Sequence, residues 1–281
     1  MRYYTPLRYP GGKASLAPFI RDIVLANRIS GGTYVEPFAG GGGVALELLM
    51  TGCMRRIILN DIDPGIHAFW CSVLNAPGAL IERLQTVPLT IDEWHRQREI
   101  LETEGHGDIL ALGFAALYLN RVNRSGILRG GIIGGLSQTG RWLMDARFNR
   151  QAIAQRISRV AQYANKIAVY REDAEHFLAK LDLPERSLLY IDPPYYHKGQ
   201  RLYRNHYEHA DHARVAELVQ SRLDHPWIVS YDDTQEIAEL YRRCRQAHLH
   251  LRYSAQVKRH ASELVIFSDD LSIPDREELA S

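Results

Sequence analysis

The chain has 281 residues, of which 46% are hydrophobic and 24% charged, and its formal net charge is +1. These values are ordinary for a soluble globular protein, and the length allows one large domain or one domain with an insertion. No apolar run approaches 18 residues and no secretory leader is recognisable, which argues against a membrane protein and leads us to expect a cytoplasmic one. The three cysteines (Cys53, Cys71 and Cys244) are widely spaced and fit no metal pattern, so we expect reduced packing residues.

The first motif is R-Y-P-G-G-K, at Arg8 to Lys13. Adjacent glycines let a backbone pass close to a partner, and Lys13 opens an amphipathic stretch that ends near Ile29. A tight turn before a helix would use the same residues, so this motif alone does not assign a function.

A strand, a glycine-rich loop and a helix are predicted next, over Thr33 to Glu36, Pro37 to Gly43 (P-F-A-G-G-G-G) and Val44 to Met50. In this arrangement backbone N–H groups at the helix start face a ligand. No Gly-Lys-Ser/Thr follows, so the loop is not a phosphate-binding P-loop. The spacing also differs from G-x-G-x-x-G, which argues against a nicotinamide dehydrogenase.

A second strand, Arg56 to Asn60, ends in Asp61-Ile62-Asp63. A carboxylate at the end of the second strand, roughly 20 residues after the glycine loop, is placed to accept both hydroxyls of a ribose. Asp63 precedes Pro64, a pattern typical of a helix cap. We therefore assign Asp61 to the ribose and Asp63 to the cap.

Residues 65 to 164 interrupt the alternation of strands and helices and are interpreted as an inserted, mostly helical lobe. Its clearest helix spans Thr90 to Glu104 and begins with a Thr-x-x-Glu capping box. The stretch Leu117 to Trp142 then places six glycines among basic residues, which fits a loop or β-hairpin; a flexible hinge is the alternative. Nine Lys or Arg residues stand between Ala115 and Lys166 against one acid, Asp145, which is the charge pattern of a phosphate contact.

Strands and helices alternate again after the lobe. Helices are predicted over Asn149 to Tyr163, Asp211 to Leu223 (Asp211 as N-cap) and Thr234 to Tyr241, and strands over Lys166 to Tyr170, Ser187 to Ile191, Trp227 to Tyr231, His248 to Tyr253 and Glu263 to Ser268. The fold class is therefore α/β, with a mostly parallel seven-stranded sheet and helices on both faces.

The fourth strand carries the stretch that the function depends on, S-L-L-Y-I-D-P-P-Y-Y. Pro193 and Pro194 have no N–H to continue a ladder, so the strand stops at Asp192. A carboxylate, a rigid turn and two aromatic rings are thus expected together at the carboxyl end of a strand, where open α/β sheets bind ligands. Asp-Pro-Pro is also an ordinary way to leave a strand, and this motif alone leaves both interpretations open.

His206, His209 and His212 are spaced by three, but they have no cysteine partner and Asp211 suits a cap. We expect no metal site.

Taken in order, the motifs resemble those of the Dam-like, α-group adenine-N6 DNA methyltransferases. The corresponding segments are R-Y-P-G-G-K, E-P-F-A-G-G-G from Glu36, N-D-I-D from Asn60, N-R-V-N-R-S-G-I-L-R from Asn120, and D-P-P-Y from Asp192. The glycine-rich continuation, Gly130 to Trp142, differs from Dam itself, so the resemblance does not assign the recognition sequence.

The resemblance implies a Rossmann-like class I methyltransferase fold with S-adenosyl-L-methionine as co-substrate. Residues 1–64 and 165–281 would form the catalytic domain, and residues 65–164 the target-recognition domain with its β-hairpin. The implied cofactor contacts are Tyr9, Lys13, Phe38, Gly40, Gly42, Asp61, Asp173 and Asp192. The implied catalytic residues are Asp192, Pro193 and Tyr195, and the implied DNA contacts are Arg121, Arg124, Ser125 and Arg129, although Arg121 and Arg124 could instead support the fold.

The implied reaction is methylation of the N6 amine of a flipped-out adenine in double-stranded DNA. Asp192 and the Pro193 carbonyl are natural acceptors for the two amine protons, and Tyr195 can stack on the base. Alternatives are another nucleobase amine (cytosine N4, or RNA) and a DNA-binding relative without turnover. A cognate restriction or defence component is an optional further partner, and no membrane is implied.

Overall fold

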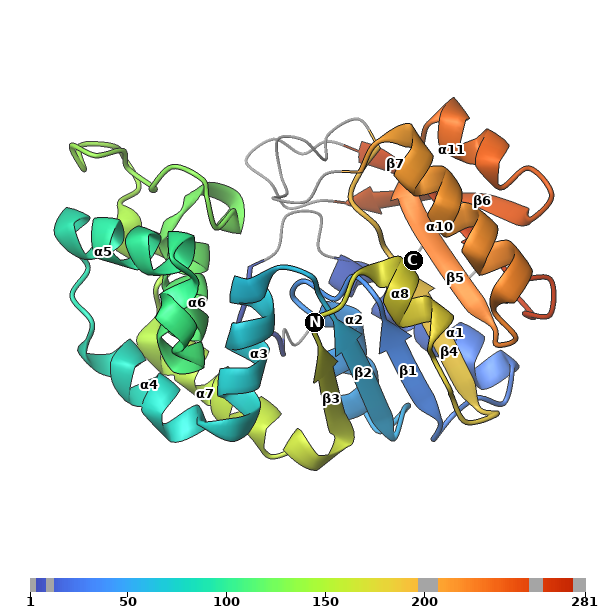
Figure 1. Cartoon of the computed structure of the whole chain (residues 1–281), viewed down its shortest axis with the longest axis horizontal. Helices are drawn as coiled ribbons and strands as arrows, with labels where there is room; N and C mark the ends of the chain where they lie inside the picture. The colour runs from blue at the N-terminus through green and yellow to red at the C-terminus, as the bar shows by residue number, and fades with distance from the viewer. Residues whose placement is uncertain (1–3, 9–12, 197–206, 253–259, 275–281) are drawn as a thin grey trace. The chain divides into compact units, whose positions relative to one another are not determined.

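The computed structural model describes residues 4–8, 13–196, 207–252 and 260–274, and seven strands in them form one mixed sheet (Figure 1). The strands are β1 (Thr33–Glu36), β2 (Arg56–Asn60), β3 (Ile167–Tyr170), β4 (Ser187–Ile191), β5 (Trp227–Asp232), β6 (Arg245–Arg252) and β7 (His260–Phe267). Their order is β3-β2-β1-β4-β5-β7-β6. β1 is parallel to β2 and β4, β4 is parallel to β5, and β7 is antiparallel to β5 and β6. The predicted α/β sheet is confirmed.

The helices are α1 (Ala17–Ala26), α2 (Gly43–Met50), α3 (Pro64–Asn75), α4 (Pro77–Thr86), α5 (Ile91–Glu102), α6 (Ile109–Val122), α7 (Arg150–Ala161), α8 (Ala174–Ala179), α10 (His209–Arg222) and α11 (Gln235–Leu240). A single turn, η1 (Lys13–Leu16), precedes α1. The described residues divide into two compact units: unit 1 holds residues 4–8, 40–43 and 61–171, and unit 2 holds residues 13–39, 44–60, 172–196, 207–252 and 260–274.

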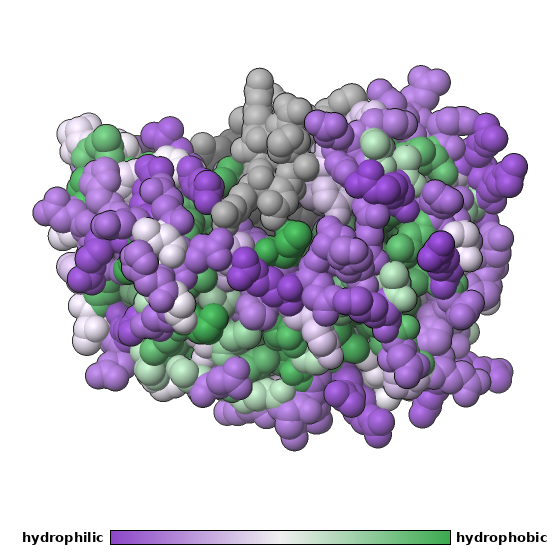
Figure 2. Space-filling model, viewed as in Figure 1, coloured by the Kyte–Doolittle hydropathy of each residue, from purple (hydrophilic) through white to green (hydrophobic). Residues whose placement is uncertain are grey.

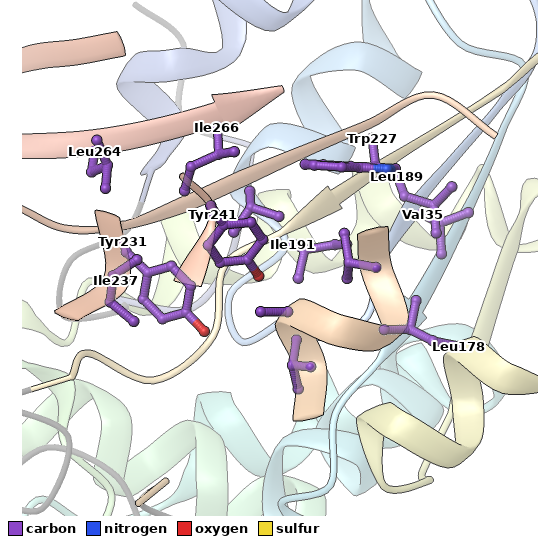
Figure 3. Packing of buried hydrophobic residues seen from close by; sticks show 14 of the residues in the cluster. Val35, Leu178, Leu189, Ile191, Trp227, Tyr231, Ile237, Tyr241, Leu264 and Ile266 are labelled. Carbon is purple, nitrogen blue, oxygen red and sulfur yellow. The ribbon is translucent and has the colours of Figure 1, made fainter. Parts of the chain in front are cut away.

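One face of the sheet in unit 2 is covered by apolar packing (Figure 3). Alternate strand residues, which point to the same side of a pleated sheet, supply Val35, Leu189, Ile191, Val229, Tyr231, Leu264 and Ile266. They meet α8, α10 and α11, whose contributions include Leu178, Val219 and Ile237. Burial of this kind is the main favourable term in folding, and it fixes the strand ends from which the site is built.

The other face of the same strands is apolar at one end and polar at the other. It receives α1, whose Phe19 ring stands edge-on to Phe267 with 6.1 Å between centroids. Toward the carboxyl end of the parallel strands, however, this face carries Glu36 on β1, Tyr190 on β4 and Ser230 on β5, all buried. Buried polar groups must find partners, so this end of the sheet is where a functional cluster is expected.

Unit 1 is held together by close packing of α3 against α6. A Cβ added at Gly113 would lie 2.5 Å from the Ala68 carbonyl oxygen, so only glycine permits this approach. The predicted cap at Thr90 is confirmed, because its Oγ1 accepts from the Glu93 N–H at 3.2 Å. Asp63 also caps α3 as predicted, accepting from the N–H groups of Gly65 and Ile66 at 2.8 and 3.1 Å.

Two local predictions differ from the structure. The helix expected to begin at Asp211 begins at His209, and Glu208 is its N-cap, because Asp211 occupies the third helical position and closes a capping box with the Glu208 N–H at 2.7 Å. The β-hairpin that the resemblance implied after Asn120 is reduced to one antiparallel bridge, Asn123 to Ile132, followed by turns, which agrees with the loop that the glycine-rich sequence also allowed. Its glycines favour turns over paired strands.

The face seen in Figure 2 is mainly hydrophilic, with hydrophobic side chains scattered among polar ones. Three of the large hydrophobic residues exposed in the described ranges belong to the turn-rich segment after Ile132: Leu136, Trp142 and Leu143. No helix within the described residues is long and apolar enough to cross a membrane.

Candidate active site

Asp192 follows the last residue of β4, as the sequence predicts. Its side chain is 27% exposed, so the carboxylate is partly accessible rather than sealed in the core. Two groups contact its Oδ1 atom: the Ser230 hydroxyl donates at 2.8 Å, and the Lys13 ammonium lies at 3.4 Å. Pro193 is buried and Tyr195 half-buried, so the turn is anchored directly after the carboxylate.

Lys13 is a buried cation at the start of η1. Its Nζ atom is 2.7 Å from Oε2 of Glu263, a buried residue of β7, and 5.0 Å from the centroid of the Tyr195 ring. The ammonium therefore joins three strand-end features: the carboxylate of Glu263, the carboxylate of Asp192 and the aromatic ring of Tyr195.

The carboxyl groups here are poorly solvated. Burial raises the pKa of Asp192, while the Lys13 charge and the Ser230 hydrogen bond act in the opposite direction. Burial also raises the pKa of Glu36 to about 8, offset in part by the Ala45 N–H that donates to it at 3.0 Å, and the charge of Asp192 adds to the increase. Two neighbouring acids with raised pKa values are typical of a functional site.

Aromatic and histidine side chains pack behind the Asp-Pro-Pro-Tyr turn. The Tyr196 N–H donates to Asp232 Oδ1 at 2.9 Å, and the Tyr196 hydroxyl is 3.0 Å from His209 Nδ1. His212 is buried with its Nδ1 3.0 Å from the Tyr231 hydroxyl, and burial lowers its pKa to about 4. The neutral ring therefore serves the packing of the turn.

Phe38, one of the residues implied to contact the cofactor, lies in unit 2 at the start of the glycine loop. Its ring stands edge-on to Tyr207 with 5.8 Å between centroids. Whether it also contacts a cofactor stays a prediction.

Residues 40–43 of the glycine loop belong to unit 1, and Gly40 is hydrogen-bonded to Asp61. Gly40 and Gly42 have φ angles of 46° and 55°, values that favour glycine. Asp61 accepts from the Gly40 N–H at 2.8 Å through Oδ2 and from the Asp63 N–H at 2.9 Å through Oδ1. Burial, together with the charge of Asp63, raises the pKa of Asp61 to about 7. The loop and Asp61 are thus joined by a hydrogen bond.

Asp173 acts as the N-cap of α8, because its Oδ1 accepts from the N–H groups of Glu175 and His176 at 3.0 and 3.3 Å. A contact to the adenine of a cofactor stays a prediction. Tyr9 and His206 lie outside the described residues, and no group of three or more potential metal ligands occurs in the ranges the structure describes.

The Asn120 motif is organised by its two asparagines, which sequence reasoning did not single out. Asn120 is fully buried; it accepts from the Arg8 N–H at 2.7 Å and donates to the carbonyls of Arg8 and Gly126 at 2.6 and 2.9 Å. It thereby fixes the start of the R-Y-P-G-G-K motif against this loop. Asn123 is also buried and donates to the carbonyls of Ile127 and Leu128 at 3.0 and 2.9 Å.

The four residues implied to contact DNA differ in their accessibility. Arg121 is 6% exposed and donates to the Pro6 carbonyl; burial, with the charges of Arg156 and Arg8, lowers its pKa to about 9. Its contacts favour the interpretation that it supports the fold. Arg124, Ser125 and Arg129 are exposed, and Ser125 adopts φ 58°. A DNA contact from these three stays a prediction.

Comparison with known proteins bears on the function. Residues 9–256 match the model of the family described as D12 class N6 adenine-specific DNA methyltransferase. The Type II methyltransferase M.MjaIII of Methanocaldococcus jannaschii is 24% identical over 202 residues, which cover 67% of this chain and 68% of that protein.

The solved structures matched by this chain include an rRNA methyltransferase and an rRNA methylase. The match to AviRa of Streptomyces viridochromogenes covers 93% of this chain and 87% of the AviRa chain, with 16% identity and a TM-score of 0.42. The match to an rRNA methylase of Streptococcus thermophilus covers 88% of this chain and 93% of the methylase chain, with 9% identity and a TM-score of 0.34. Both TM-scores are low, so the functional assignment depends on the family match and the site residues.

Proposed function

Because the chain belongs to the D12 class of N6 adenine-specific DNA methyltransferases, we propose that it methylates adenine within a specific DNA site, with S-adenosylmethionine as donor and Asp192 as the central catalytic residue. The family makes DNA adenine methylation the activity. The donor, the flipped base and the role of each residue are our proposals.

One observation carries the assignment: a partly exposed carboxylate stands at the end of β4, next to the buried Lys13 ammonium and the Tyr195 ring. The N6 amine of adenine is a poor nucleophile because its lone pair is delocalised into the ring. Acceptors for both amine protons favour the pyramidal nitrogen, whose lone pair can attack. Asp192 and the Pro193 carbonyl supply such acceptors, and proline's fixed φ holds the carbonyl in place.

The residues present fit the proposed donor. Gly40 and Gly42 give a loop without side chains, and the half-buried Asp61 carboxylate suits ribose hydroxyls. When bound, S-adenosylmethionine would supply a methyl group activated by its sulfonium charge, and the sulfur would leave as a neutral thioether. Asp192 need not remove a proton before attack, because the nitrogen becomes acidic once it is methylated.

The target amine is hidden in a duplex, so the base must leave the stack, at a cost of a few kcal/mol. Stacking of the base on Tyr195 would contribute about 1–3 kcal/mol, which is comparable to the cost of base flipping but does not exceed it. The loop after Asn120 is the proposed source of the remainder, because it exposes two cations, Arg124 and Arg129, and two large hydrophobic side chains, Leu136 and Trp142.

Mass analysis of nucleosides tests the proposal. DNA and RNA are each incubated with the protein and methyl-labelled S-adenosylmethionine and then digested. We expect labelled N6-methyladenine from double-stranded DNA alone. Labelled N4-methylcytosine or a labelled RNA nucleoside would identify a different amine, and sequence-specific DNA binding without any labelled product would indicate a non-catalytic relative.

A further inference from the structure

The contacts of Asp192 are unequally divided between its two oxygens. Both polar contacts recorded for it within the described ranges, the Ser230 hydroxyl at 2.8 Å and the Lys13 ammonium at 3.4 Å, fall on Oδ1. A carboxylate that must accept a hydrogen bond from an amine needs an oxygen whose lone pairs are not already engaged. Oδ1 is therefore engaged by protein groups, whereas Oδ2 has no such contact within the described ranges.

We propose that Ser230 and the Lys13–Glu263 ion pair are positioning groups for methyl transfer, which occupy Oδ1 of Asp192 and leave Oδ2 as the acceptor of the target amine. The inference rests on the proposed function, in which Asp192 is the catalytic carboxylate. It assigns a positioning role to Glu263 and Ser230, and it changes the role expected for Lys13 from a cofactor contact to a positioning group.

The direction of the Ser230 hydrogen bond is fixed by its second partner. The Tyr190 hydroxyl lies 2.7 Å from Ser230 Oγ, and both residues are buried. Burial raises the pKa of Tyr190 well above its ordinary value, so the phenol keeps its proton and can donate it. Tyr190 then donates to Ser230, and Ser230 donates to Asp192, so each hydroxyl proton has one acceptor.

The strand register explains why these three side chains meet. Tyr190 is paired with Ile228, and Ile191 with Val229, so Ser230 lies beside Asp192 on the same face of the sheet. Tyr190 and Ser230 are therefore held in position by the sheet, and the hydrogen bond from Ser230 orients the Asp192 carboxylate.

Glu263 holds Lys13 in a similar way from the neighbouring strand. It is 2% exposed and is paired with Asp232 across β5 and β7, and its Oε2 atom is 2.7 Å from Lys13 Nζ. Of these two carboxylates, Glu263 lies closer to the ammonium than Asp192 does. Lys13 therefore stabilises the ionised Asp192 at 3.4 Å without closing a tight ion pair that would compete with the substrate amine.

Two substitutions test the two supports separately. Ser230→Ala removes the donor to Oδ1, and Ser187→Ala is its matched control, because Ser187 is also buried and hydrogen-bonded but lies at the start of β4. Glu263→Gln keeps shape and removes charge, and Glu93→Gln on α5 is its control as another buried, ion-paired glutamate. Melting temperature confirms that each variant is folded.

Single-turnover methyl transfer, kcat and the Kd for S-adenosylmethionine are the readouts. We expect Ser230→Ala and Glu263→Gln each to lower the transfer rate about 10- to 100-fold, the range for losing a hydrogen bond to a charged group. The cofactor Kd and the KM for DNA should stay within about threefold, and the controls should match the wild type.

The double variant Lys13→Met with Glu263→Gln separates positioning from cofactor binding without leaving an unpaired buried charge. Positioning predicts a slow enzyme with an unchanged cofactor Kd, whereas direct cofactor contact by Lys13 predicts a raised Kd.

If Asp192→Ala retains the wild-type rate, the proposed function is wrong. If Asp192→Ala is inactive while folded Ser230→Ala and Glu263→Gln match the wild type, or if the double variant loses cofactor affinity at an unchanged transfer rate, the positioning inference alone is overturned.

Discussion

Glu36→Gln is expected to change how the stability of the protein depends on pH. Glu36 is 5% exposed at the end of β1, and burial beside the charge of Asp192 raises its pKa from 4.5 to about 8. Between these two values the native state holds a proton that the unfolded chain releases. The free energy of unfolding therefore falls as pH rises through this window, by up to about 1.4 kcal/mol per pH unit.

Between pH 6 and pH 8 the contribution of Glu36 to this loss is about 2 kcal/mol, because its titration begins to level off near pH 8. Glutamine resembles the protonated acid, and its carbonyl oxygen can still accept from the Ala45 N–H, which donates at 3.0 Å in the wild type. The variant should therefore match the wild type near pH 6 and be more stable than it by about 2 kcal/mol at pH 8.

Urea unfolding followed by tryptophan fluorescence at pH 6, 7 and 8 measures both proteins. Asp61, whose pKa is also raised, contributes equally to both curves, so its effect cancels in the difference, whereas the interaction between Glu36 and Asp192 is part of the difference that is measured. Parallel curves for the two proteins would refute the argument, as would a difference that shrinks toward high pH.

Three further predictions concern the cofactor, the fold and the DNA. The pKa of Asp61 is about 7, so the affinity for the cofactor should fall about tenfold from pH 8 to pH 6, and Asp61→Asn should abolish this pH dependence. Calorimetric titration at both pH values measures the affinity, and equal wild-type affinities at pH 8 and pH 6 would mean that Asp61 makes no cofactor contact. Arg121→Ala should reduce stability by about 1–3 kcal/mol, because it leaves the buried Pro6 carbonyl without its donor; an unchanged urea midpoint would contradict this. Arg129→Ala should leave that midpoint unchanged and weaken DNA binding, which fluorescence anisotropy would detect; equal affinity would remove Arg129 from the interface.

Elements specified by local chemistry could be predicted from the sequence. β1 and β2 have the predicted bounds, and the caps at Asp63 and Thr90 act as expected, because the side chain and the N–H groups it accepts from are separated by two or three residues. The start of α10 was misassigned because Glu208 and Asp211 are both acids suited to a helix start, and only the backbone geometry separates cap from third position.

Contacts between distant residues were beyond local reasoning. Lys13 and Glu263 meet across 250 positions, and Arg121 meets Pro6 across 115. The period-two pattern of strands was a usable signal, because it puts Ser230 on the same face of the sheet as its polar neighbours on β4. No comparable pattern marks Arg121, which has the same residue type as the exposed Arg124 and Arg129 beside it.

The central claim is that Asp192 carries out methyl transfer to adenine. The most direct measurement is single-turnover formation of N6-methyladenine in duplex DNA by Asp192→Ala, with Asp182→Ala, an exposed acid before β4, as the control. We predict that Asp192→Ala binds S-adenosylmethionine within a few-fold of the wild type while the transfer rate falls by at least about 100-fold. Methylation by Asp192→Ala at the rate of the Asp182→Ala control would contradict the account.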